Sequence, residues 1–134
     1  MDVATSGADE VVAGILVRDG QVLLCHRTAG RKWYPDVWDL PGGHVEAEET
    51  VLGALVGELE EELGVVIKEP SGQEFSRLVT NEVDLRIWVI QEWIGTPVNA
   101  SPNEHDHVEW FSSGAVAGLR LAHESYISLI AEAL

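Results

Sequence analysis

The stretch from residue 49 to residue 63 constrains the fold of this chain more than any other. Apolar side chains recur there at spacings of three and four residues, which gathers them into one stripe along a helix: Val51, Leu52, Leu55, Val56, Leu59 and Leu63. Thr50 stands where a helix start favours a side-chain oxygen, and Gly64 is a typical C-terminal stop. The pattern therefore predicts an amphipathic helix that buries one face against the rest of the protein.

Runs with the composition of β-strands lie on both sides of this helix. They are residues 11–17, 21–27, 75–80, 83–93 and 108–111. Asp19-Gly20 separates the first two runs and is a turn signal, so we expect a hairpin. Pro41-Gly42-Gly43 follows the short apolar run 38–40 and is expected to break the chain.

The remaining segments complete the expected fold. Residues 28–37 and 95–106 carry glycine, proline and polar residues and are expected to be loops, whereas residues 123–134 are expected to form a closing helix. The order of strands, helix, strands and helix predicts an α+β fold, an α/β/α sandwich with a mixed β-sheet. We expect one domain over residues 10–134, preceded by a flexible tail over residues 1–9.

The charge of the chain limits its partners. Its 23 acidic and 8 basic residues give a net charge of −15, whereas proteins that bind long nucleic acids need basic surface. A small phosphorylated substrate remains compatible with this charge, because divalent cations screen carboxylates and bridge them to phosphates. No apolar run reaches the roughly 20 residues that span a membrane, and no signal peptide is recognisable. With a single cysteine, Cys25, these features favour a cytoplasmic protein and leave its oligomeric state, a homodimer included, open.

Three carboxylates cluster on the expected helix. Glu58, Glu61 and Glu62 stand at i, i+3 and i+4, so their Cβ atoms lie about 5–6 Å apart on one face and their charges repel. A helix gains no stability from this arrangement, but a helix that binds Mg²⁺ or Mn²⁺ does, since hard divalent ions prefer several oxygen ligands. Taken alone, the cluster would favour a solvated acidic face of an amphipathic helix over a metal site.

The surrounding residues resemble a known motif. Gly43, Glu49 and the run Gly57-Glu-Leu-Glu-Glu-Glu-Leu-Gly-Val65 resemble the Nudix box of the MutT/Nudix hydrolase family, G-x5-E-x7-R-E-U-x-E-E-x-G-U, where U is a bulky apolar residue. Eight of the nine defined positions match, and the segment from Leu40 to Glu46 is similar to the family's approach to the box. The resemblance covers roughly residues 10 to 133.

The resemblance implies a Nudix fold in which the box forms a loop–helix–loop that holds Mg²⁺ or Mn²⁺. The metal ligands it implies are the carbonyl of Gly42 and the carboxylates of Glu58, Glu61, Glu62 and, from a late loop, Glu104. Asp106 and Glu109 are the alternatives to Glu104. The catalytic roles fall to Glu61, Glu58 and Glu104, and Glu49 is expected to be structural or to support the ligands.

The implied reaction is hydrolysis of the pyrophosphate linkage of a nucleoside di- or triphosphate-type substrate, as in nucleotide-pool cleaning or housekeeping. Water attacks phosphorus, metal lowers the pKa of that water, and a glutamate takes its proton. A nucleoside triphosphate is the first candidate, because the chain lacks the extra domain of many sugar-nucleotide members. ADP-ribose-like and other small diphosphates remain open.

Four residues are candidates for substrate binding. Arg27 would pair with a phosphate, with Arg31 and Lys32 as weaker candidates. Trp33 and Tyr34 would stack on a base, an interaction of about 1–3 kcal/mol per base. The fourth, His123, stands where the branch that acts on oxidised guanine nucleotides has an asparagine, which argues against strict 8-oxo-dGTP specificity. A surface charge at Arg27 and core packing of the aromatic rings are the structural alternatives.

Gly57 is the one departure from the box, because the family has arginine there to orient the catalytic carboxylates. Glycine inside a helix also costs about 1 kcal/mol relative to alanine. Three interpretations follow: a weakened or specialised hydrolase that keeps every metal-type glutamate, a nucleotide-binding or regulatory module of the same fold with weak or altered catalysis, or an engineered substitution. We expect retained activity.

Overall fold

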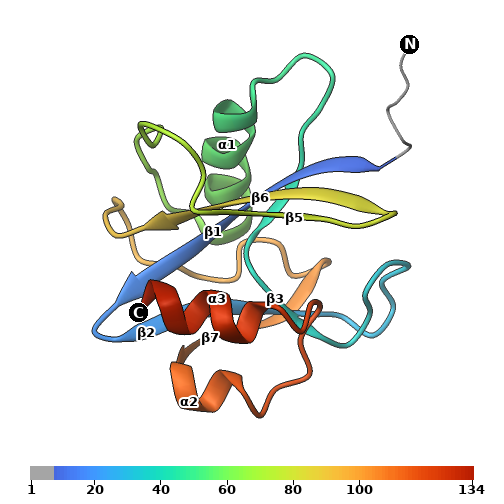
Figure 1. Ribbon diagram of the computed structural model, residues 1–134, viewed down its shortest axis with the longest axis vertical. Helices are drawn as coiled ribbons and strands as arrows, with labels where there is room; N and C mark the ends of the chain where they lie inside the picture. The colour runs from blue at the N-terminus through green and yellow to red at the C-terminus, as the bar shows by residue number, and fades with distance from the viewer. Residues whose placement is uncertain (1–7) are drawn as a thin grey trace.

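The computed structural model describes residues 8–134. Its strands are β1 (Asp9–Arg18), β2 (Gln21–Arg27), β3 (Trp38–Asp39), β4 (Gly42–His44), β5 (Ser76–Val79), β6 (Val83–Ile90) and β7 (His105–Ser112). Its helices are α1 (Val51–Leu63), α2 (Ser113–Val116) and α3 (Tyr126–Ala133) (Figure 1). The expected tail falls largely on residues 1–7, outside the described residues, and β1 begins at Asp9.

The long strand β1 organises the sheet, whose strand order is β3-β2-β1-β6-β5. β1 runs parallel to β6 from Asp9↔Val83 to Leu16↔Ile90 and antiparallel to β2 and β4, so the sheet is mixed, as expected. The predicted hairpin between β1 and β2 is confirmed. Asp19 and Gly20 both have positive φ, 53° and 74°, which matches the turn type that the right-handed strand twist favours.

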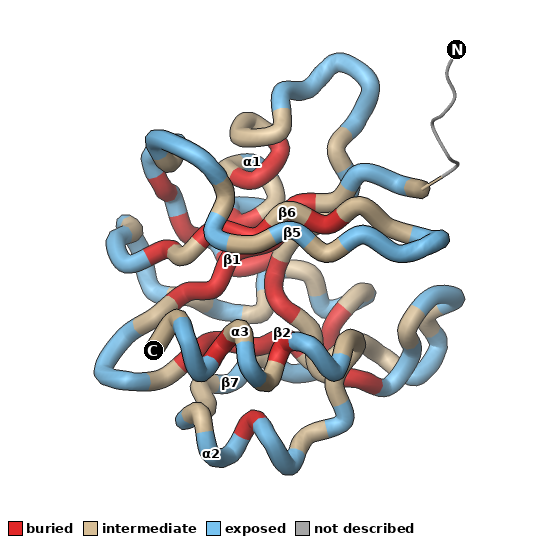
Figure 2. Tube along the Cα trace, in the orientation of Figure 1, coloured by how far each residue is buried: buried red, intermediate tan, exposed pale blue. Residues whose placement is uncertain are grey.

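Helices cover both faces of this sheet. Because neighbouring residues of a strand point to opposite faces, β1 contributes to two separate cores. Leu16 packs in one core with Leu55 and Leu59 of α1, whereas Ile15 packs in the other with Ile130 of α3. Figure 2 shows the buried residues following the central strands between these two layers. The arrangement is the predicted α/β/α sandwich.

α1 begins and ends at capping residues. The Thr50 side chain accepts a hydrogen bond from the Gly53 N–H at 3.0 Å, so the first helical residue is Val51 rather than the predicted 49. Gly64 takes the left-handed conformation, with φ of 72°, and its N–H bonds the carbonyl of Glu60. None of the described helices is both long and apolar enough to cross a membrane.

The prediction that Pro41-Gly42-Gly43 breaks the chain was wrong for its two glycines. They belong to β4, which pairs with β1 through Ala13↔Gly42 and Val12↔Gly43. A Cβ on Gly42 would overlap the backbone carbonyl of Val12, so glycine lets this segment approach β1 closely enough to extend the sheet.

Several element boundaries also differ from the prediction. β6 ends at Ile90 rather than residue 93, and α3 begins at Tyr126 rather than residue 123. β7 begins at His105, so the expected loop 95–106 ends two residues early. The reason is pairing with β2, in which Arg27 lies opposite His105.

Candidate active site

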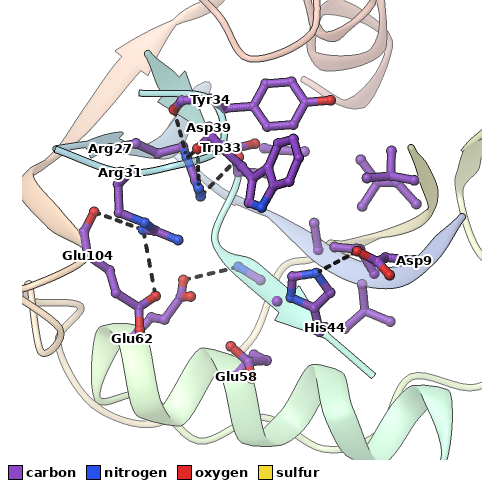
Figure 3. Close-up of a pocket in the computed structure, with 18 of the residues that line it drawn as sticks. Asp9, Arg27, Arg31, Trp33, Tyr34, Asp39, His44, Glu58, Glu62 and Glu104 are labelled. Carbon is purple, nitrogen blue, oxygen red and sulfur yellow. Dashed lines mark hydrogen bonds and ion pairs between the residues drawn. The ribbon is translucent and has the colours of Figure 1, made fainter. Parts of the chain in front are cut away.

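A cavity of about 690 Å³ opens between α1, β4, the loop after β2 and the start of α3. Every site residue predicted from the sequence lines it: Gly42, Glu58, Glu61, Glu62, Glu104, Arg27, Trp33, Tyr34 and His123. Carboxylates occupy the side formed by α1, and aromatic rings occupy the opposite side (Figure 3). The cavity therefore brings the expected metal-binding and substrate-binding residues together.

The three α1 glutamates that line the cavity differ in burial. Glu62 is buried, Glu58 is half-buried and Glu61 is exposed at the surface of the helix. Oε1 of Glu62 accepts a hydrogen bond of 3.1 Å from the Gly42 N–H, which ties the helix to β4 and fixes this carboxylate. By contrast, Glu60 is exposed and does not line the cavity, as expected for a solvated charge.

Burial and mutual repulsion perturb these carboxyl groups. Burial, followed by the charges of Glu61 and Glu104, raises the pKa of Glu58 to about 7. Burial also raises the pKa of Glu62 well above its ordinary value, against the opposing effect of the Gly42 hydrogen bond. Among residues 8–134, no lysine or arginine forms an ion pair with any of the three α1 glutamates. The cluster lacks cations of its own.

The backbone at Gly43 lies directly against the carboxylate of Glu58. A Cβ at this position would overlap the Glu58 side chain, so a larger residue would displace either β4 or the carboxylate. Glu49 organises the preceding loop, because its side chain accepts a hydrogen bond of 2.9 Å from the Glu46 N–H. The loop before α1 is thus shaped to hold the helix carboxylates against β4.

The structure separates Glu104 from its two alternatives. Only Glu104 of the three lines the cavity. The side chain of Asp106 bonds His26 at 2.7 Å, and that of Glu109 bonds His107 at 2.9 Å. Arg31 donates to the backbone carbonyl of Glu104 at 3.0 Å and lies 3.9 Å from its carboxylate.

The guanidinium of Arg27 is held by the protein rather than left as a surface charge. Its Nε and NH2 atoms donate to the backbone carbonyls of Trp33 and Tyr34 at 2.7 to 3.2 Å, and its NH1 lies 3.8 Å from Asp39. Figure 3 shows these bonds folding the loop around the arginine. Of the two arginines in the cavity, Arg31 has the more exposed side chain, 27% against 15% for Arg27, and is freer to meet a phosphate.

Aromatic rings form the wall opposite α1. Tyr34 and His123 contact each other with ring centroids 5.1 Å apart, and the Tyr34 hydroxyl donates to Glu82 at 3.3 Å. Trp33 is 59% exposed, so its ring is available to a ligand rather than packed in the core. Trp38, in contrast, packs edge-on against His26, His107 and Phe111, as the core alternative predicts.

Asp39 is a cavity residue that the sequence analysis missed. Its Oδ1 atom accepts hydrogen bonds of 2.8 Å from both the Tyr126 hydroxyl and the Leu40 N–H. Burial raises the pKa of this carboxyl, whereas the Tyr126 bond and the charge of Arg27 oppose the rise. An acid inside the apolar run 37–40 was the signal that could have identified it.

His105 falls in the segment 95–106 that was expected to be a loop, and for this residue the expectation was wrong. It begins β7, is 3% exposed and lies 3.9 Å from Glu62, where burial lowers its pKa to about 4. Its ligand atom, that of Cys25 and that of Glu62 lie within 4.8 Å of one another, a mixed nitrogen, sulfur and oxygen set. Mg²⁺ and Mn²⁺ prefer the all-oxygen set that the glutamates present on the cavity side.

Comparisons with known proteins identify relatives of this chain and a solved structure that resembles it. The family model described as NUDIX domain matches residues 9–132. The CTP pyrophosphohydrolase of Escherichia coli strain K12 is 37% identical over 98 residues, which are 73% of this chain and 70% of that protein. The 8-oxo-dGTP diphosphatase of Haemophilus influenzae is 34% identical over 75% of each chain. The solution structure of the Escherichia coli ORF135 protein has a TM-score of 0.72 and 31% identity, covering 98% of this chain and 91% of that one.

Proposed function

The chain belongs to the NUDIX family and is a pyrophosphohydrolase of that family, and we propose that its substrate is a nucleoside triphosphate. The observation that carries the proposal is that one cavity joins the α1 carboxylates to an aromatic wall. The first side suits a metal-bound polyphosphate and the second a nucleobase. The names of the two relatives, which specify CTP and 8-oxo-dGTP, support the same substrate class.

NUDIX enzymes typically depend on a divalent metal, and the donor set here fits one. Glu58, Glu61 and Glu62 crowd hard oxygen ligands together without cationic partners among residues 8–134, and this crowding helps raise the pKa of Glu58 to about 7. We propose that these three, with Glu104 and the Gly42 carbonyl, hold Mg²⁺ or Mn²⁺. When bound, the metal would lower the pKa of the attacking water and neutralise charge on the phosphoryl oxygens.

Residues of the protein would position the metal, accept the proton and bind the phosphate. Glu62 is buried and fixed by the Gly42 N–H, so it would serve as a positioned ligand rather than as a proton acceptor. Among the three helix acids that line the cavity, Glu61 is the exposed one and is best placed to take a proton from a solvent water. Arg31, at the edge of the cavity beside Glu104, would pair with a phosphate oxygen.

The proposal is tested by a panel of nucleoside triphosphates and diphosphates assayed with Mg²⁺ or Mn²⁺, with identification of the released product. We expect release of pyrophosphate or phosphate, and loss of at least a hundredfold in kcat for Glu61→Gln and Glu62→Gln, which corresponds to about 2.7 kcal/mol. Glu60→Gln is the matched control, because Glu60 lies on the same helix but outside the cavity and is expected to leave kcat unchanged.

Two outcomes would contradict the proposal. Tight binding of nucleotides without turnover under any metal would favour the binding or regulatory module that Gly57 suggests. Equal loss of activity in the Glu60 and Glu61 variants would show that the effect comes from the charge of the helix, not from the cavity.

A further inference from the structure

Three side chains of different metal-binding chemistry meet in the interior of the protein. Cys25 comes from β2, His105 from the start of β7 and Glu62 from α1. Their ligand atoms, a thiol sulfur, a ring nitrogen and a carboxylate oxygen, lie within 4.8 Å of one another, and all three residues are buried. Three segments that are distant in the sequence thus bring a sulfur, a nitrogen and an oxygen donor to one point.

The imidazole of His105 is the feature that points to a ligand. Its Nδ1 atom is buried and has no hydrogen-bond partner among residues 8–134. Its Nε2 atom lies 3.9 Å from Oε1 of Glu62, which is beyond hydrogen-bond range. The backbone is fixed here, since the His105 carbonyl accepts a bond of 2.7 Å from the Asn99 side chain. Buried polar atoms are normally satisfied, so this ring is held in place with a nitrogen left for a partner that the described residues do not supply.

Cys25 alone would be an ordinary core residue. It belongs to the apolar cluster that contains Leu55 and Leu59 of α1, and buried cysteines often behave as small apolar side chains. An apolar role does not account for the carboxylate of Glu62 and the unpartnered ring of His105 beside the thiol. Thiolate, imidazole and carboxylate together are ligands typical of Zn²⁺, whereas Mg²⁺ prefers oxygen alone.

The spacing of these atoms suits a tetrahedral zinc ion after a small contraction. Zinc bonds of about 2.0–2.3 Å place neighbouring ligand atoms about 3.4–3.6 Å apart. Here the oxygen of Glu62 and the nitrogen of His105 are 3.9 Å apart and no pair exceeds 4.8 Å, so the side chains need to close by about 1 Å. Glu62 and His105 also line the cavity, which offers the ion an entry path and a water as the fourth ligand.

We propose that Cys25, His105 and Glu62 form a binding site for Zn²⁺ that differs in chemistry from the proposed Mg²⁺ site but shares Glu62 with it. Zn²⁺ binds the thiolate and the carboxylate, and any protons these groups carry are released to solvent. Because Glu62 is shared and a second divalent charge then lies beside the α1 acids, Zn²⁺ weakens binding of the catalytic metal and inhibits hydrolysis. Only this inhibitory consequence rests on the proposed function.

Binding is tested with Co²⁺, which substitutes for Zn²⁺ and reports thiolate ligation by a charge-transfer band in the near ultraviolet. Metal-stripped protein is titrated with Co²⁺ in the presence of a phosphine reductant, which supplies no thiol. Cys25 is the only cysteine of the chain, so a thiolate band can have only one source. We expect a band that saturates at one Co²⁺ per chain and that Zn²⁺ removes. Absence of this band at every Co²⁺ concentration would overturn the site.

Two variants test the ligands separately, with circular dichroism as the check of folding. Cys25→Ser should abolish the band, and His105→Gln should raise the Kd for Co²⁺ by about tenfold or more. His107→Gln is the matched control, because His107 lies on the same strand, is exposed and bonds Glu109. Its Kd should equal that of the wild type. An unchanged Kd in His105→Gln, or an equal rise in both histidine variants, would refute the three-residue site. If Cys25→Ser does not fold, the histidine pair decides.

Inhibition is measured as triphosphate hydrolysis at fixed Mg²⁺ with increasing Zn²⁺. Cys25 is not among the residues that line the cavity, so Cys25→Ser should keep the wild-type rate without zinc. The same variant should raise the half-inhibitory Zn²⁺ concentration by about tenfold or more. Equal inhibition of the two proteins would place the inhibitory ion on the α1 acids and overturn the regulatory role. A protein that shows the cobalt band but hydrolyses no triphosphate would keep the zinc site while the proposed function fails.

Discussion

Substitutions at Gly57 distinguish the stability of α1 from its contribution to the chemistry of the site, because different side chains at this position affect the two properties separately. The residue lies inside α1, is exposed, and a Cβ added to it would meet no atom within 4 Å. Gly57→Ala should therefore gain the full helix propensity difference of about 1 kcal/mol, with no steric cost. For a domain of 134 residues, this corresponds to a rise in Tm of about 3–4 °C.

Gly57→Arg should give the same gain in helix stability and also adds a cation. It restores the residue of the Nudix box next to Glu58, whose pKa is raised by burial and by like charges alone. We expect the arginine variant to raise kcat, or to tighten Mn²⁺ binding, relative to both the wild type and the alanine variant. Exposed charge pairs contribute about 0.2–1 kcal/mol, so the expected change is about 1.5- to 5-fold.

The assays are thermal unfolding, Mn²⁺ titration and initial rates on the best triphosphate, at one pH. If both variants gained stability equally and the arginine changed neither kcat nor the Mn²⁺ affinity, Gly57 would not mark a missing catalytic support. A lower Tm for Gly57→Ala would refute the conclusion that a Cβ at this position meets open space.

Three further predictions concern the loop, the cap and the charge of α1. Gly43→Ala should lower kcat, because its Cβ forces the flexible end of the Glu58 side chain to move, whereas Gly30→Ala, whose Cβ meets nothing, should keep the wild-type rate in the same assay. Thr50→Ala removes the α1 cap and should lower the free energy of unfolding by about 1 kcal/mol in urea titrations, and an unchanged midpoint would contradict the capping role. The folded protein retains the Glu58 proton up to about pH 7, whereas an unperturbed carboxyl loses it near 4.5, so the wild type in EDTA should lose stability relative to Glu58→Gln as pH rises between these values. A difference in unfolding free energy that does not vary with pH would show that Glu58 is not perturbed.

The helix α1 was predictable because its structure depends on a local sequence pattern. The apolar stripe of α1, its Thr50 cap and its Gly64 stop are all contained in neighbouring residues, and the structure confirms them. The hairpin at Asp19-Gly20 is local in the same way. Positive φ and helical spacing are properties that short sequences express by themselves.

The errors arose where distant segments meet. β4 was missed because glycine reads as a chain breaker until β1 is known to lie against Gly42. His105 was assigned to the loop 95–106 because its neighbours are polar, whereas pairing of β7 with β2 makes it a buried strand residue. Asp39 escaped notice because the Tyr126 hydroxyl that bonds it lies 87 residues away in the chain. Contacts between distant segments determine the structure at such positions, and no local sequence pattern reveals those contacts.

The carboxylates of α1 also link the stability of the domain to its function. Folding carries Glu62 into the interior and places Glu58 beside Glu61, so the metal-free site retains repulsion and desolvation that the apolar cores on both faces of the sheet must offset. A bound divalent cation would remove much of that cost, and any ligand that binds only the folded state stabilises it by mass action. The acids that make α1 a poor isolated helix are thus the same ones that are proposed to bind the metal. The stability that α1 lacks locally, at Gly57 and at its crowded acids, is supplied by its packing against the core and, in the proposed enzyme, would be supplied in part by the metal.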